Sequence, residues 1–144
     1  MQLTPHFALE ELCHSDIAQR LGIPNDPPAD VIANLAIAAQ GMEAVRSALG
    51  NHAILVHSGY RSHEVNAAVG GAPNSDHCNG YAVDFVSAGM ENYDAALAIQ
   101  SSGIRFDQLI LEYGWVHISF APAMRNQVMT KKSAATPYLV GLIA

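Results

Sequence analysis

The chain has 144 residues, of which 50% are hydrophobic and 14% charged, and 13 acidic against seven basic residues give a formal net charge of -6. This length fits one compact domain over residues 1–144, with a core that needs no disulfide bonds. The low share of charged residues excludes an intrinsically disordered chain, and the acidic balance argues against nucleic-acid binding, which relies on clustered Lys and Arg.

The N-terminal residues lack the basic start and apolar stretch of a secretory signal, and no apolar run approaches the ~18 residues that span a bilayer. We therefore expect a protein that is synthesised in the cytoplasm without a signal peptide and has no membrane segment. In that setting Cys13 and Cys78 are expected to be free thiols, with a disulfide between them as the alternative.

The spacing of apolar residues predicts the secondary structure in chain order. The predicted elements are one helix or two short ones over 8–21, a long amphipathic helix over 29–49, a strand over 53–57, a short helix over 62–69, a strand over 81–86, a helix over 92–102, a hairpin over 106–120 and a weak strand over 138–143. Helices and strands that mix without strict alternation predict the α+β class, with a mainly antiparallel sheet flanked by helices.

The strand over 81–86 carries a carboxylate among apolar residues. Alternation along a strand places Asp84 on the same face as the small Ala82, while the residues between them point into the core. A carboxylate in such a place is costly unless it is paired or bound to a metal. His77 stands close upstream, before a sharp turn that Gly80 permits. Asp84 therefore requires a partner, and a histidine is near.

A second histidine lies on the predicted hairpin. A two-residue turn at 113–114 places Glu112 opposite Trp115, and His117 opposite Ile110. Cross-strand neighbours share a face, so Glu112 and His117 both project where Trp115 does. This register makes an acid and an imidazole neighbours.

Together, His77, Asp84 and His117 make up a recurring catalytic zinc set, in which three protein ligands leave one position for water. Glu112 beside the metal would act as general base on a metal-activated water and pass the proton to the leaving amine. Taken singly, each of the four has an ordinary structural role as its alternative. Cys78 is a further candidate ligand, disfavoured because successive side chains of an extended chain diverge.

These residues also form a recognisable motif. The pattern runs Ser75-x-His77-x-x-Gly80-x-Ala82-x-Asp84, followed downstream by Trp115-x-His117. It resembles the signature of the zinc D-alanyl-D-alanine carboxypeptidases and L-alanyl-D-glutamate endopeptidases, which are grouped with the hedgehog signalling domain. The resemblance extends from about residue 6 to the tail. It implies a hedgehog-like, DD-peptidase-like fold, one zinc ion held by the two histidines and the aspartate, and cleavage of peptides in bacterial peptidoglycan.

The resemblance also implies roles around the metal. Arg61 matches the family's arginine, which binds substrate and stabilises developing negative charge; its alternative is a surface salt bridge. Ser75 and Trp115 are further predicted substrate-binding residues, and the indole N–H of Trp115 is expected to be free to reach a substrate oxygen. Many relatives place their catalytic acid three residues before the last histidine, where this chain has Gly114. Here Glu112 takes that role, because the hairpin register puts it on the required face.

The sequence therefore predicts a zinc-dependent peptidoglycan peptidase of the D-Ala-D-Ala carboxypeptidase or L-Ala-D-Glu endopeptidase type. One alternative is a zinc-stabilised peptidoglycan-binding or structural module without turnover, and another is a non-peptidase hydrolase that uses the same metal. The missing export signal predicts release by another route, as for a phage endolysin, with a tail-associated or housekeeping role as the alternative. We expect a monomer that acts on the cell wall.

Overall fold

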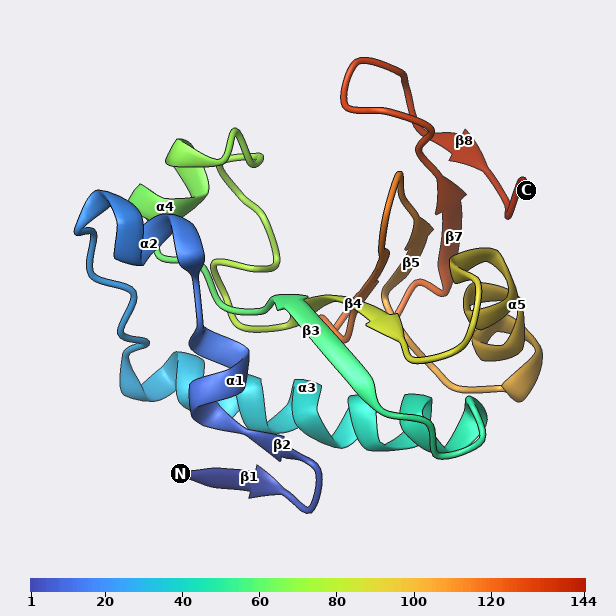
Figure 1. Cartoon of the computed structure of the whole chain (residues 1–144), viewed down its shortest axis with the longest axis horizontal. Coiled ribbons are helices and arrows are strands. Elements are labelled where there is room, and N and C mark those ends of the chain that lie inside the picture. The colour runs from blue at the N-terminus through green and yellow to red at the C-terminus, as the bar shows by residue number, and fades with distance from the viewer.

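The computed structural model describes residues 1–144 as a mixed fold of five helices and two sheets (Figure 1). The helices are α1 (Leu9–Cys13), α2 (Asp16–Leu21), α3 (Ala29–Ala48), α4 (His63–Ala68) and α5 (Asn92–Ser102). The strands are β1 (Gln2–Thr4), β2 (Phe7–Ala8), β3 (Ile54–Ser58), β4 (Ala82–Ser87), β5 (Gln108–Leu111), β6 (Val116–Ser119), β7 (Gln127–Thr130) and β8 (Leu139–Val140).

Six of the strands form one sheet in the order β3-β4-β6-β5-β7-β8, and β1 pairs with β2 in a small sheet of its own. All neighbours in the large sheet are antiparallel except β5 and β7, which are parallel. The predicted α+β class with a mainly antiparallel sheet is confirmed. The pattern missed β1, β2 and β7, which have two to four residues and are too short for a clear alternation.

The long helix α3 covers one face of the sheet. Its buried residues recur every three or four positions and form one apolar stripe: Val31, Leu35, Ala38, Ala39, Met42 and Val45. Gly41 allows a close approach, because a β-carbon at that position would overlap the ring of Phe120. The helix ends at Ala48, one residue before the predicted end at Leu49, whose backbone N–H still bonds back into the helix.

Helix α5 packs on the same face as α3, and the core lies between the two helices and the strands. Ala95 and Ala96 are fully buried, and these small side chains let the helix lie close to β5. Gly103 ends α5 in the left-handed conformation, with a φ of 83°, which only glycine adopts without strain.

The central strands have two different faces. Val83 and Phe85 of β4 and Val116 and Ile118 of β6 are fully buried against the helices. The alternate residues of the same strands therefore point to the opposite face, which neither α3 nor α5 covers. That face is where the predicted site residues lie.

Two further expectations concern the whole chain. Cys13 and Cys78 are both free thiols in the structure, as expected. None of the helices combines the length and the apolar character that crossing a lipid bilayer requires.

Candidate active site

Two of the three predicted ligands are paired across neighbouring strands. Asp84 of β4 lies directly opposite His117 of β6, and His117 in turn lies opposite Ile110 of β5. The pairing of His117 with Ile110 is the register that the hairpin predicted. Nδ1 of His117 is 2.8 Å from Oδ1 of Asp84. The sheet therefore brings an imidazole and a carboxylate together on its uncovered face.

The third residue, His77, comes from the turn that leads into β4. Gly80 closes this turn with a φ of +80°, and a β-carbon there would lie 2.9 Å from a methyl group of Val31 on α3. The turn thus rests directly on α3, and only glycine allows that approach. His77 itself is 2% exposed, and its Nε2 lies 3.3 Å from Oδ1 of Asp84.

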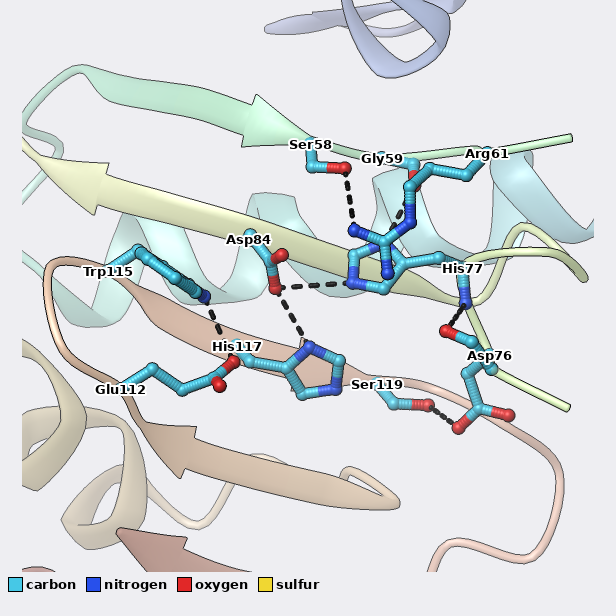
Figure 2. Close-up of polar contacts among 11 residues, drawn as sticks. Ser58, Gly59, Arg61, Asp76, His77, Asp84, Glu112, Trp115, His117 and Ser119 are labelled. Atoms are coloured by element: carbon cyan, nitrogen blue, oxygen red, sulfur yellow. Dashed lines mark hydrogen bonds and ion pairs between the residues drawn. The ribbon is translucent and has the colours of Figure 1, made fainter. Parts of the chain in front are cut away.

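The other ring nitrogen of His77 is fixed by the backbone. Nδ1 lies 2.7 Å from the carbonyl oxygen of Gly59, so Nδ1 carries the proton and Nε2 has its lone pair free toward Asp84. The N–H of Tyr60 donates to the carbonyl of Leu12, and the N–H of Arg61 donates to the carbonyl of His77. The bonds of Gly59 and Arg61 to His77 hold the segment after β3 against the turn, and the bond of Tyr60 ties the same segment to α1. Figure 2 shows Gly59 and Arg61 beside His77.

The donor set fits a zinc ion. One nitrogen from each of His77 and His117 and one oxygen from Asp84 lie within 4.8 Å of one another. Two imidazoles and a carboxylate are zinc ligands of the catalytic type. The hydrogen bond from His77 to a carbonyl is the support that metal-bound histidines usually have. Cys78 is not part of this group, which agrees with the choice of ligands made from the sequence.

The electrostatics of the three groups are coupled. Burial disfavours the charged form of Asp84, yet the adjacent His77 and His117 hold its pKa far below the usual range. Burial would likewise lower the pKa of His117, but its hydrogen bond to Asp84 and the charge of that carboxylate raise it overall. Asp84 is therefore ionised in the folded protein, as a metal ligand must be.

Glu112 lies beside this set. Its N–H donates to the carbonyl of Trp115, which continues the hairpin ladder beyond β5 and β6, and the indole N–H of Trp115 donates to Oε2 of Glu112 at 2.9 Å. Burial, and then the negative charge of Asp84, raise the pKa of Glu112. The expectation of a free indole N–H is wrong: Trp115 orients the acid instead.

Arg61 and Ser75 lie on the other side of His77. Nη1 of Arg61 is 3.5 Å from the hydroxyl of Ser58, and its Nε is buried without a hydrogen-bond partner. Arg61 makes no salt bridge within the protein, so its guanidinium keeps donors available for a ligand. The hydroxyl of Ser75 accepts the N–H of His77 at 3.2 Å, which shapes the turn.

All seven predicted site residues line one cleft of about 1020 Å³. A second hollow of about 710 Å³, beside α1 and α2, contains none of them. The other lining residues had no role in the sequence analysis, and they include Asp76, Lys131 and Tyr138. Asp76 stands next to His77 and could have been noticed there. Nothing in the sequence indicates that the tail carrying Lys131 and Tyr138 returns to the site.

A buried His-Asp-His set at the floor of a polar cleft, with a carboxylate beside it, defines the class of mononuclear metallohydrolases. A family model described as Peptidase M15 matches residues 5–119. The chain therefore belongs to the peptidase M15 family.

One curated relative sharpens the comparison. Over 78 residues the chain is 36% identical to the zinc D-Ala-D-Ala carboxypeptidase of Streptomyces albus G. These residues make up 54% of this chain and 30% of the relative. The matched part is thus less than a third of that protein's length. The family resemblance predicted from the motif is confirmed.

Proposed function

We propose that this chain is a zinc-dependent peptidase that cleaves short peptides of bacterial peptidoglycan, with residues 1–144 acting as one peptidase domain. Family membership and the name of the carboxypeptidase relative support this function. The single observation that carries it is the convergence of His77, Asp84 and His117 beside Glu112 in one cleft.

Zinc would be held by Nε2 of His77, a carboxylate oxygen of Asp84 and Nδ1 of His117, the atoms that face one another. When bound, zinc supplies a Lewis acid for the scissile carbonyl and a lower pKa for the attacking water. The two histidines must be neutral to bind, so the affinity for zinc falls as they become protonated.

Glu112 is the proposed general base. The raised pKa of Glu112 suits a general base, because a carboxylate whose pKa lies nearer the operating pH can both accept a proton and give it up again. In its ionised form it accepts a proton from the attacking water, and it then gives this proton to the nitrogen of the leaving amine. The hydrogen bond from Trp115 holds one carboxylate oxygen and leaves the other for this exchange.

Arg61 is the proposed electrophilic partner. Its unpaired Nε and its weak contact with Ser58 leave the guanidinium able to hold a carbonyl or carboxylate oxygen of the peptide. Ser75 keeps a hydroxyl proton that it can donate to the substrate, since its oxygen is the acceptor in its bond to His77.

The substrate is a wall peptide cut either at D-Ala–D-Ala or at L-Ala–D-Glu, and both bonds use the same zinc ligands. The name of the Streptomyces relative favours the first. We further propose a monomer that acts on the cell wall, in the manner of a phage endolysin.

Digestion of purified peptidoglycan, followed by mass spectrometry of the fragments, tests the function and identifies the bond. We expect release of D-alanine or of peptides with wild-type protein, no release after treatment with a chelator, and recovery on adding zinc. Glu112→Gln should bind zinc and release no fragments, while Glu64→Gln on the exposed surface of α4 serves as the matched control. Zinc binding without fragment release by wild-type protein would favour a module that lacks turnover.

A further inference from the structure

Two acidic residues, Glu112 and Asp76, are bonded to opposite ends of the uncovered face of β6. Along this strand and its approach the residues on the cleft side are Trp115, His117 and Ser119, of which Trp115 bonds Glu112 and Ser119 bonds Asp76. The two carboxylates therefore lie on opposite sides of His117 (Figure 2). Residues two apart on a strand are separated by roughly 7 Å. Asp76 is thus within one or two peptide residues of the reacting bond.

The carboxylate of Asp76 is held in place. Its Oδ2 accepts the hydroxyl proton of Ser119 at 2.7 Å, and Ser119 is fully buried on β6. Its Oδ1 accepts no hydrogen bond from the protein, and the residue lines the cleft. One oxygen of Asp76 is therefore fixed by Ser119, and the other keeps its hydrogen-bonding capacity for a ligand in the cleft that Asp76 lines.

The charge of Asp76 has no partner in the protein. No Lys, Arg or His nitrogen forms an ion pair with it. Arg125 lines the same cleft, but its Nε and Nη2 each bond Asp107 at 2.8 Å, so that this pair is neutral as a unit. A half-buried carboxylate is stabilised when a cation reaches it. Because Asp76 lines the cleft and forms no ion pair in the protein, a cationic group of a bound ligand is the partner that its carboxylate lacks.

We propose that Asp76 binds an ammonium group of the substrate, on the side of the zinc ligands away from Glu112. This inference rests on the proposed function, because it names what the peptide carries near the bond that is cut. The ammonium is either the free α-amino end of a short peptide or the side-chain amine of a diamino acid residue. Asp76 is then a specificity-determining residue. It lies within the motif, between Ser75 and His77, but is not one of the proposed zinc ligands.

Four peptides with one scissile bond test the proposal: both amines free, only the α-amine acetylated, only the side-chain amine acetylated, and both acetylated. Asp76→Asn keeps an oxygen for Ser119 and removes the charge. We expect kcat/KM to fall roughly tenfold to a hundredfold in this variant for peptides that keep the recognised amine, and to stay unchanged when it is acetylated. The acetylation pattern then shows which amine is bound. Asp94→Asn, on the exposed surface of α5, is the matched control.

Binding is measured separately, by calorimetry on the Glu112→Gln protein with and without Asp76→Asn. A preference for the free amine that disappears with Asp76→Asn supports the subsite even if wild-type protein cleaves none of the peptides, in which case only the proposed peptidase function fails. An equal loss for free and acetylated peptides would mean that Asp76 only anchors the turn to β6, and this overturns the proposal. So does the absence of any preference for the amine in both assays.

Discussion

Nδ1 of His77 lies 2.7 Å from the carbonyl oxygen of Gly59, eighteen residues earlier in the chain. This bond fixes which nitrogen of the imidazole faces Asp84. Gly59 in turn lies against the carbonyl oxygen of Leu12 at the end of α1, where there is no room for a β-carbon. The orientation of one proposed ligand therefore depends on the packing of the N-terminal segment.

Gly59→Ala should weaken zinc binding roughly tenfold to a hundredfold, as expected for loss of support to a ligating histidine. The new β-carbon would overlap the backbone of Leu12 and displace the carbonyl that holds His77. Zinc affinity is measured by competition with a chelating dye. Gly41→Ala is the control, because its β-carbon would overlap the ring of Phe120, which packs against α3 on the face of the sheet opposite the ligands. It should cost about 1–3 kcal/mol of stability and leave zinc affinity intact.

Zinc should stabilise the fold itself. At a thousandfold excess of free zinc over its Kd, the free energy of unfolding should rise by about 4 kcal/mol in wild-type protein, because only the folded chain assembles the three ligands. Asp84→Ala should show almost none of this gain. Urea unfolding with zinc and with a chelator measures both. An equal gain in the two proteins would place the bound zinc elsewhere.

The pH dependence of kcat/KM should report Glu112. Its ionised form is the proposed base and its pKa is raised, so activity is full above that pKa and falls as pH decreases through it. The hydrogen bond from Trp115 lowers the pKa of Glu112, so Trp115→Phe should move this acidic limb to higher pH. A limb that stays in place would show that Glu112 is not the titrating base.

Asp107 should make stability depend on pH. The hydrogen bonds from Arg125 hold the pKa of Asp107 below its ordinary value of 3.8, against the effect of burial. The ionised form is thus favoured by folding, and this stabilisation is present above the ordinary pKa and is lost as pH falls through the folded one. Urea unfolding from neutral pH down to below the ordinary pKa of 3.8 should show a higher free energy of unfolding for wild-type protein than for Asp107→Asn at neutral pH. This difference in free energy should shrink as the solution becomes more acidic. Asp94→Asn, on the exposed surface of α5, is the matched control.

Local patterns were sufficient to predict the elements that make the site. The stripe of α3, the chain turn at Gly80 and the pairing of His117 with Ile110 all follow from short-range spacing. The pairing of Asp84 with His117 does not, because it joins strands that are thirty-three residues apart and depends on strand order. The resemblance of the motif to a known family nevertheless implied that Asp84 and His117 bind the same metal ion.

Other features left no trace in the sequence. A backbone carbonyl such as that of Gly59 has no side-chain signal, so its bond to His77 could not be foreseen. The indole N–H of Trp115 was expected to be free for a substrate oxygen, and only the geometry of the hairpin shows that it donates to Glu112. The return of Tyr138 to the cleft depends on β7 pairing in parallel with β5, a contact between segments joined by a long connection.

The strand order places the proposed zinc site and the C-terminal tail in different parts of the sheet. The residues proposed to bind zinc and to act as the base lie on or beside β3, β4, β6 and β5. Strands β7 and β8 lie at one edge of the sheet and lead the tail to the cleft wall. Mutations accumulating after residue 119, where the family match ends, can reshape that wall while the chemistry stays fixed.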